Sequence, residues 1–458
     1  MIRCPNCTAQ LEFDAKSQNV KCDYCGSIFN PKDLEVKVKK AKEIEEIGTC
    51  EGKSYTCSQC GATLLTFDKT AITFCSYCGS QAMLESKLIK KNNPQLIIPF
   101  KKTKEECMAA YKKKITKSLF TPNYMKSDLV VSKFRGIYIP YCIYKLSFHG
   151  DSSSKGEKYS HRIGDYVYYD QYKIEARVDA DYDGISYEMV SNLYDSFTHA
   201  IPHNYNEAQP FNTNYLAGFY ADTSDVNNYI YEDNAINVAS TDAKNKLLSQ
   251  REFSKYNCRN PKVNFQVTDK KTGMFPLYFL AIRDKKEQYV NYAIVNGQTG
   301  KVVIDLPVDF KKYIFLSLIL SVIIFLIINS WLVVVPTTIT IFSVICAIIS
   351  LIISIVQMSK IHSRQTHSDD EGYMFVQDPN QEKTSKIKLR YIAKQLISII
   401  LGIAVVILKL ASDIYYYGSA IIILCLVIFS FYDLVKEHNL LVSTKLPQLE
   451  KRGGSENE

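Results

Sequence analysis

Eight cysteines near the start of the chain have the spacing of metal ligands. They form two copies of the pattern C-x2-C-x14-C-x2-C, and the second copy lies 53 residues after the first at all four positions. Two thiolates in a CxxC turn lie about 4 Å apart, which suits Zn–S bonds of about 2.3 Å. We therefore predict two zinc sites of four cysteines each. The ligands are Cys4, Cys7, Cys22 and Cys25 in the first site and Cys57, Cys60, Cys75 and Cys78 in the second.

Other cysteine chemistry fits this pattern less well. Disulfides require an oxidising compartment, and no apolar signal segment precedes Cys4. A redox CxxC of the thioredoxin type lies in a βαβ context and would not occur four times. Because four thiolates complete the coordination of zinc, we expect both ions to be structural rather than catalytic. A hairpin of this size buries too little apolar surface to fold alone, so zinc is expected to supply much of its stability.

The elements that position these ligands are predicted to be two small β ribbons in a multidomain chain. Ribbon one covers residues 1–31, a charged linker 32–49, and ribbon two 50–84. An α+β cytoplasmic domain rich in tyrosine is expected over 95–307. Thr103-Lys-Glu-Glu106 predicts a capping box for a helix that runs to about Leu119. Strand patterns follow from Gly136, helices are plausible near 186–200 and 233–250, and Asn296–Gly300 predicts the turn of the final hairpin.

The last third of the chain has the composition of a membrane domain. Residues 313–358 contain no Asp, Glu, Lys, Arg or His, and a helix needs roughly 20 apolar residues to cross a bilayer. A second apolar region follows the polar loop at 359–390. These lengths predict an all-α domain of four transmembrane helices over 313–435, followed by a cytoplasmic tail at 436–458. The expected spans are 313–335, 337–358, 391–411 and 418–435.

The distribution of charge predicts how this domain is oriented. Lysines and arginines lie before the first span, in the loop at 359–390 and after the last span. Under the positive-inside rule these segments face the cytoplasm, so both termini are expected there. The predicted location is the plasma membrane, with the lipid bilayer as a partner. The same bias accounts for most of the formal net charge of +8. We found no ionisable residue at the middle of a predicted span, which favours an anchor over a transporter.

No motif predicts a catalytic or cofactor-binding site. Gly297-Gln-Thr-Gly300-Lys301 lacks the spacing of a phosphate-binding loop and reads as a turn. His199 and His203 are four residues apart, but Pro202 excludes a helical metal-binding pair. The prediction is a protein that is not an enzyme and has no evident small-molecule substrate.

With these features the chain resembles a bacterial family of TFIIB-type zinc-ribbon membrane proteins. The resemblance rests on the paired ribbons, Ile97-Ile-Pro-Phe100, Gly136-Ile-Tyr-Ile-Pro-Tyr141, Asn296-Gly-Gln-Thr-Gly-Lys301 before Leu306-Pro307, and the apolar C-terminal third. Some members of such families are membrane partners in phage-shock-type envelope-stress systems, where they help to recruit PspA-like or flotillin-like proteins. The resemblance therefore implies an adaptor, and it supplies no catalytic residues.

Three function classes remain open at this point. The first is a membrane-anchored adaptor or scaffold that recruits a cytoplasmic protein. The second is a membrane-tethered nucleic-acid binder, which we disfavour because neither ribbon is basic: Arg3, Lys16 and Lys21 are offset by Glu12, Asp14 and Asp23 in ribbon one, and Lys69 by Asp68 in ribbon two. The third is an enzyme such as a helicase, which the absence of a Walker loop disfavours.

Overall fold

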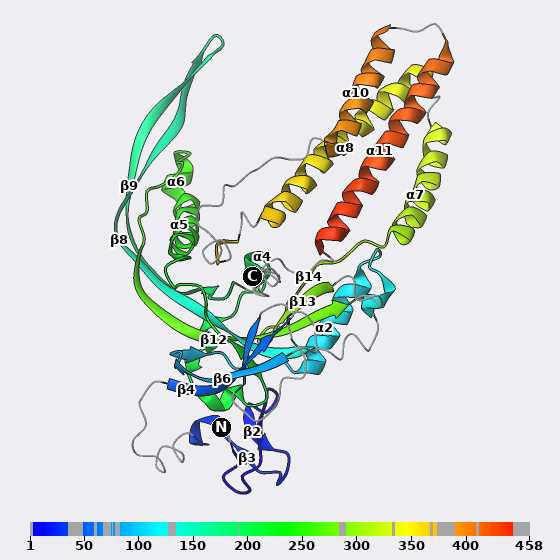
Figure 1. Cartoon of the computed structure of the whole chain (residues 1–458). Coiled ribbons are helices and arrows are strands. Elements are labelled where there is room, and N and C mark those ends of the chain that lie inside the picture. Colours follow the sequence, from blue (N-terminus) through cyan, green and yellow to red (C-terminus); the bar gives the residue numbers. More distant parts are fainter. Residues whose placement is uncertain are drawn as a thin grey trace, which may run out of the picture.

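The computed structural model describes thirteen segments of the chain. They are residues 3–34, 49–58, 62–66, 75, 77, 83–126, 134–191, 193–283, 290–331, 335–366, 370–372, 390–408 and 412–442. A large mixed sheet occupies the middle of the molecule, with a small ribbon at one end and long helices at the other (Figure 1).

Ribbon one is a three-stranded antiparallel sheet of its own. Its strands are β1 (Leu11–Asp14), β2 (Asn19–Cys22) and β3 (Ile28–Phe29), in that order. Leu11, Phe13 and Val20 point into a buried core, and polar residues alternate with them. This alternation is typical of a strand with one buried face. Ribbon one is therefore a small β structure with one buried face.

The expected second ribbon is not a separate unit. Its strands β4 (Thr49–Cys57), β5 (Thr63–Thr66) and β6 (Met83–Asn92) belong to an 11-stranded sheet of the described residues. β5 pairs with β11 (Tyr220–Asp222), where Leu65 lies opposite Ala221. The prediction of two small independent ribbons was therefore wrong. A hairpin with little core of its own gains one by joining a larger sheet.

The rest of this sheet is built on two long strands, β8 (Arg135–Ile163) and β12 (Gln266–Arg283), which pair antiparallel. The remaining strands are β7 (Leu96–Ile97), β9 (Tyr166–Glu188), β10 (Gln209–Pro210), β13 (Val290–Asn296) and β14 (Val302–Ile304). The path of neighbouring strands is β10-β7-β12-β8-β11-β5-β4-β6. Off this path, β13 pairs with β12 and β14, and β9 pairs with β8.

Helices flank the sheet. Helix α2 (Lys104–Lys117) has the predicted capping box, in which Thr103 and Glu106 each bond the other's backbone N–H. The predicted turn is also confirmed, since the Gly300 N–H donates to the Asn296 carbonyl at 2.8 Å. The other helical segments are η1 (Asn123–Lys126), α4 (Asp195–His199), η2 (Tyr205–Glu207), η3 (Thr213–Leu216), α5 (Glu232–Ser249) and α6 (Arg251–Lys255).

The β8–β9 hairpin continues beyond the sheet as a curved two-stranded arm (Figure 1). β8 pairs with β12 only as far as Ser147, whereas it pairs with β9 as far as Ile163, which lies opposite Tyr166. Helices α5 and α6 lie along one side of the arm, where Phe148 and Ile174 pack against their core. The last backbone bond of this brace joins the Glu157 N–H to the Tyr256 carbonyl at 2.6 Å.

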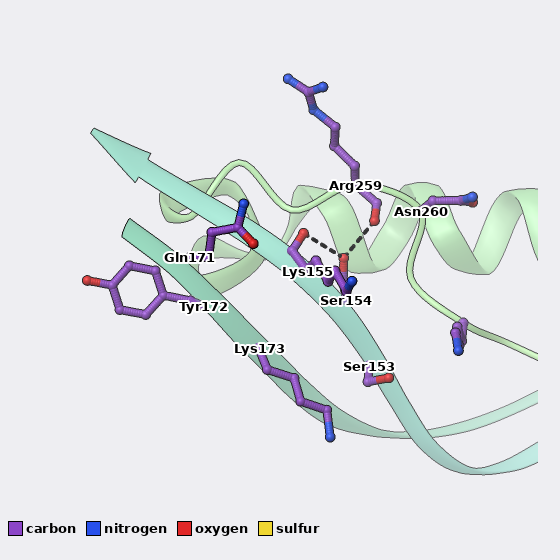
Figure 2. Close-up of a pocket in the computed structure, with 9 residues that line it drawn as sticks. Ser153, Ser154, Lys155, Gln171, Tyr172, Lys173, Arg259 and Asn260 are labelled. Carbon is purple, nitrogen blue, oxygen red and sulfur yellow. Dashed lines mark hydrogen bonds between the residues drawn. The ribbon is translucent and has the colours of Figure 1, made fainter. Parts of the chain in front are cut away.

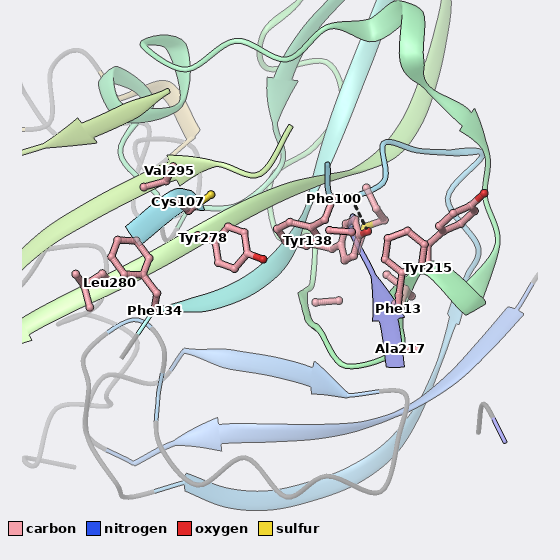
Figure 3. Packing of buried hydrophobic residues seen from close by; sticks show 14 of the residues in the cluster. Phe13, Phe100, Cys107, Phe134, Tyr138, Tyr215, Ala217, Tyr278, Leu280 and Val295 are labelled. Atoms are coloured by element: carbon pink, nitrogen blue, oxygen red, sulfur yellow. Dashed lines mark hydrogen bonds between the residues drawn. The ribbon is translucent and has the colours of Figure 1, made fainter. Parts of the chain in front are cut away.

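The core of ribbon one is continuous with that of the sheet domain. Figure 3 shows Phe13 of β1 beside Tyr215 and Ala217, in a row of buried residues that continues through Phe100 and Tyr138. The Phe13 and Tyr215 rings meet edge to face at 5.2 Å. The Phe13 N–H donates to the Ala217 carbonyl at 3.1 Å. Ribbon one is therefore fixed to the domain rather than tethered to it.

The prediction of an all-α domain with four membrane spans was wrong. The C-terminal helices are α7 (Phe310–Trp331), α8 (Pro336–Thr366), α10 (Arg390–Leu408) and α11 (Asp413–Val442). Among the described residues, two are long and apolar enough to cross a membrane, over Pro336–Arg364 and Asp413–Asn439. The apolar part of α10 is Ala393–Leu408, about 24 Å at 1.5 Å per residue and short of a core of about 30 Å. Residues 332–334 of the expected first span lie outside the described residues.

The interior of the C-terminal helices is partly polar. Gln395 of α10 is fully buried and donates to Ser354 of α8 at 2.9 Å and also to Ser430 of α11. Lys394 forms an ion pair with Asp433. Small hydroxyl side chains and this amide let the three helices approach closely.

Candidate metal centre

Ribbon one brings its four predicted ligands together. Cys4 and Cys7 precede β1, Cys22 ends β2, and Cys25 lies in the turn before β3. The four sulfur atoms all lie within 4.8 Å of one another, so the cluster can hold a metal ion. The Cys4 and Cys25 sulfurs are 3.6 Å apart, and those of Cys7 and Cys22 are 3.5 Å apart.

The two CxxC turns have the same backbone structure. In the first, the Thr8 N–H donates to the Cys4 carbonyl and the Cys4 N–H to the Ala9 carbonyl, at 2.9 and 2.8 Å. In the second, the Gly26 N–H donates to the Cys22 carbonyl and the Cys22 N–H donates to the Ser27 carbonyl, each at 2.9 Å. The equivalent residues Thr8 and Gly26 both have a positive φ, of 59° and 71°. Glycine adopts this conformation readily at Gly26, whereas Thr8 adopts it despite its Cβ.

The pKa values of Cys25 and Cys7 are shifted in opposite directions. Hydrogen bonds from the Ser27 side chain and backbone lower the pKa of Cys25 to about 6. A hydrogen bond from Ala9 lowers the pKa of Cys7. Burial and the neighbouring thiols together outweigh this effect and raise the pKa to about 12. A metal ion that replaces these protons removes the repulsion between the thiolates.

The second predicted site is described in part. Cys57 ends β4 and is buried, as is Cys75. The Cys57 N–H donates to the Ala62 carbonyl at 2.9 Å, the same bond by which Cys4 and Cys22 begin their turns. Cys60 and Cys78 lie outside the described residues.

Equivalent tyrosines in the two units have opposite surroundings. Tyr24 and Tyr77 occupy the same place in Cys-x-Tyr-Cys-Gly-Ser. Tyr24 is 85% exposed, whereas Tyr77 is fully buried and donates a hydrogen bond to Asp222 of β11. The first unit therefore presents Tyr24 at the surface, whereas Tyr77 of the second unit is bound to the sheet.

The described residues hold another group of metal-ligand types, which the sequence analysis missed. Glu188, Asp195 and His199 have ligand atoms that all lie within 4.8 Å of one another. The available signal was Asp-x3-His, because residues four apart share a helix face. The spacing of His199 and His203 instead suggests a pair that Pro202 excludes. His203 donates to the Pro276 carbonyl at 3.2 Å and packs against the Tyr141 and Phe275 rings.

Basic side chains gather in a groove between the hairpin arm and the loop after α6. The groove has a volume of about 540 Å³ and includes Lys155, Lys173, Arg259 and Lys262 among its lining residues. Figure 2 shows Arg259 and Lys173 extending in opposite directions in this view. The Ser154 hydroxyl donates to the Arg259 carbonyl at 2.8 Å and joins the two walls. These two cations are thus spread along the groove rather than directed at one point.

Comparison with known proteins finds an uncharacterized relative and no matching family model. No family model matches the chain, and no solved structure matches it. The chain is similar to the uncharacterized protein YdjG of Bacillus subtilis (strain 168), with 28% identity over 324 residues. The alignment covers 68% of this chain and 91% of that protein. The resemblance to TFIIB-type zinc-ribbon membrane proteins therefore stays a prediction.

Proposed function

We propose that this protein is a membrane-anchored adaptor that recruits a cytoplasmic protein through its zinc ribbon. The observation that carries the proposal is the position of the four-cysteine cluster. It lies on a ribbon that is packed firmly on the sheet domain, at the end of the molecule opposite α8 and α11 (Figure 1). A helical anchor and a fixed, remote ribbon suit a protein that holds a partner at a set distance from a bilayer.

Zinc is the proposed ion for the four-cysteine cluster. A tetrahedron with Zn–S bonds of about 2.3 Å has edges of about 3.8 Å, close to the sulfur separations of 3.5 and 3.6 Å. We extend the proposal to a second zinc at Cys57, Cys60, Cys75 and Cys78, on the basis of the repeated spacing. Four cysteines complete the coordination and leave no position for water, so we assign these sites no chemical step.

The anchor in this proposal consists of α8 and α11. Apolar side chains on both are exposed, among them Phe342 and Ile352 on α8 and Ile421 and Ile428 on α11. A bilayer would cover them. We place the chain in the plasma membrane with both termini on the cytoplasmic side, because the flanking lysines and arginines favour that side. A protease that cuts a C-terminal tag only after the cells are permeabilised would support this orientation, and cutting in intact cells would contradict it.

The proposed partner surface is the exposed turn of ribbon one. Tyr24 and Ile28 are 85% and 62% exposed and lie on either side of Gly26. Exposed aromatic and aliphatic side chains on a rigid turn can enter a partner's pocket at low entropic cost. Zinc holds this turn in place, and in that sense it is structural.

The test is crosslinking and pulldown of the full-length chain from cells. A partner that binds as proposed is captured by the wild type, lost from a Tyr24→Asp/Ile28→Asp variant, and retained by the control Leu119→Asp. Leu119 is 68% exposed and follows α2, outside ribbon one in the sequence. The partner's share of the membrane fraction should fall with the same variant. Capture that is equal in all three proteins would contradict the proposal.

Metal analysis tests the zinc sites separately. Reduced, freshly purified protein should hold two zinc ions per chain, and Cys22→Ser should hold one. The Cys107→Ser control should keep both, because Cys107 is a buried thiol of α2 outside the two units. A wild type with one zinc or none would contradict the two-site proposal.

The basic groove favours a second candidate function, the binding of nucleic acid. Spread cations suit an extended phosphate backbone better than a single anion. Salt-sensitive binding of DNA or RNA by the full-length protein, reduced by Lys155→Ala/Arg259→Ala and unaffected by the Tyr24→Asp/Ile28→Asp variant, would support this candidate. If, in addition, no protein partner is captured, nucleic-acid binding would take the place of the adaptor function.

A further inference from the structure

Three side chains with metal-ligand atoms converge between the sheet and the C-terminal helices. Glu188 is the last residue of β9, and Asp195 and His199 are the first and last residues of α4. Residues four apart in a helix share one face, so the two α4 side chains lie on the same side. The ligand atoms of all three residues lie within 4.8 Å of one another.

The buried Glu188 carboxylate lacks part of the hydrogen bonding it needs. Its residue is fully buried, and one oxygen accepts from the Thr198 hydroxyl at 2.5 Å. The other oxygen, Oε2, is buried and accepts no hydrogen bond from the part of the chain that the structure describes. An unsatisfied buried carboxylate oxygen costs stability unless a proton or a cation is bound to it.

Asp195 is held as a second acceptor. It is 2% exposed, and its Oδ1 accepts from the Tyr231 hydroxyl at 2.9 Å. Its Oδ2 accepts from the Glu371 N–H at 3.0 Å. Donors of this kind fix the direction of a ligating carboxylate. Burial, and next the charge of Asp195, raise the pKa of Glu188 well above its ordinary value, as expected where two carboxylates face each other.

His199 completes the set from the solvent side. It is exposed, so the group can be reached from solution. Burial of part of the ring lowers the pKa of His199, which favours the neutral imidazole that binds metals. The Tyr187 ring packs edge to face against the imidazole at 5.0 Å and restricts its orientation.

In the contacts that the described residues make, no Lys or Arg side chain supplies a positive charge to the two buried carboxylates. Arg364 of α8 lies over the Tyr194 and Phe197 rings, at 5.3 and 5.2 Å. Its guanidinium forms its ion pair with Asp305. A second buried polar atom also lacks a partner here, since the Tyr141 hydroxyl is unsatisfied and its pKa is raised by burial and then by Glu188 and Asp195.

We propose that Glu188, Asp195 and His199 bind a divalent first-row transition-metal ion. Two carboxylates and one imidazole suit manganese, iron or zinc, whereas magnesium and calcium prefer oxygen ligands alone. The ion supplies the positive charge that the two buried carboxylates lack. It also joins β9 and α4 to the segment after α8, because Asp195 bonds both the metal and the Glu371 N–H.

The test is a manganese titration of the full-length protein with its cysteine-bound zinc in place. Mn²⁺ is the probe because it prefers oxygen and nitrogen over thiolates, and its free form is measured by electron paramagnetic resonance. The wild type should bind one Mn²⁺ per chain. His199→Gln and Glu188→Gln should each weaken binding by about tenfold or more. The control Asp242→Asn should bind as the wild type does, because Asp242 pairs with Lys246 on α5, outside this group.

A second readout separates metal binding from a shared proton. Mn²⁺ or Zn²⁺ should raise the melting temperature of the wild type but not that of Glu188→Gln. Failure of the wild type to bind either ion would overturn the proposal. Retention of full affinity by His199→Gln would overturn it as well. An ion-independent gain in stability in Glu188→Gln, without binding by the wild type, would assign a shared proton to the two carboxylates instead.

Discussion

Asn291 of β13 donates a hydrogen bond of 2.7 Å to the backbone carbonyl of Val442, the last residue of α11. Both residues are buried, and the Tyr124 hydroxyl donates to the Asn291 side-chain oxygen at 2.6 Å. Nearby, Asn439 of α11 forms two hydrogen bonds with the backbone of Val308, each of 2.8 Å. The sheet domain and the last helix are thus joined by specific polar contacts rather than by a loose linker.

Asn291→Ala should loosen this junction. The substitution leaves the Tyr124 hydroxyl and the Val442 carbonyl without this partner, at a cost of about 1–3 kcal/mol. Hydrogen exchange of the full-length protein should become faster at residues 437–442 and change little in ribbon one. The control Asn206→Ala, at an exposed position of η2, should leave exchange at the junction as it is. Equal exchange in all three proteins would show that the contact contributes little.

Gly26→Ala tests the positive φ in the second CxxC turn. A Cβ at Gly26 meets no atom within 4 Å, so its cost comes from the backbone angle of 71°, about 1 kcal/mol. Gly164→Ala is a matched control, because Gly164 has a φ of 59° and equally open space at the tip of the arm. We expect faster loss of zinc to a chelator in the Gly26 variant and wild-type rates in the Gly164 variant. Faster loss in both would point to a global effect.

Tyr77→Phe and Tyr24→Phe should differ in stability although they occupy equivalent positions. Tyr77→Phe removes a buried hydrogen bond to Asp222 and should lower the free energy of unfolding by about 1–3 kcal/mol. Tyr24 is 85% exposed, so its substitution should change this quantity by less than about 0.5 kcal/mol. Denaturant unfolding of the two proteins measures the difference. Equal values would contradict the packing of ribbon two into the sheet.

His203 should contribute to the pH dependence of stability. Burial lowers its pKa to about 4, from about 6.5 in an unfolded chain. Between these values the unfolded chain binds a proton that the folded chain does not. Stability from His203 is therefore fully present above about pH 6.5 and is lost as the pH falls toward about 4. In His203→Gln the decline of the unfolding free energy should be shallower, by about 1 kcal/mol per pH unit. An unchanged slope would contradict this role.

The sequence predicted what local spacing determines. The CxxC turns of ribbon one, the Thr103 capping box and the Asn296–Gly300 turn depend on residues within a few positions of one another, and all three are confirmed. The charged and apolar composition also indicated helices that could enter a membrane, of which two qualify among the described residues.

The errors concern contacts between distant segments. The pairing of Leu65 with Ala221 places ribbon two in the large sheet, and no local pattern in residues 50–84 specifies it. Buried polar residues such as Gln395 were hidden in an apolar run, because hydropathy does not report which helix face meets another helix. Glu188 was missed although it precedes Asp195 by only seven residues, because no periodic pattern connects the end of β9 with α4.

The brace on the hairpin arm divides it into parts of unequal stiffness. Up to Glu157 the arm is bound to Tyr256 and packed against α5 and α6. Beyond that point it continues for six residues to Ile163, about 20 Å at 3.3 Å per residue. This distal part carries exposed aromatic rings, including Tyr159 and Tyr166. We therefore expect the arm to bend beyond Glu157, where a deflection of about 10° would displace the aromatic tip by about 3–4 Å and leave ribbon one and the metal-ligand groups in place.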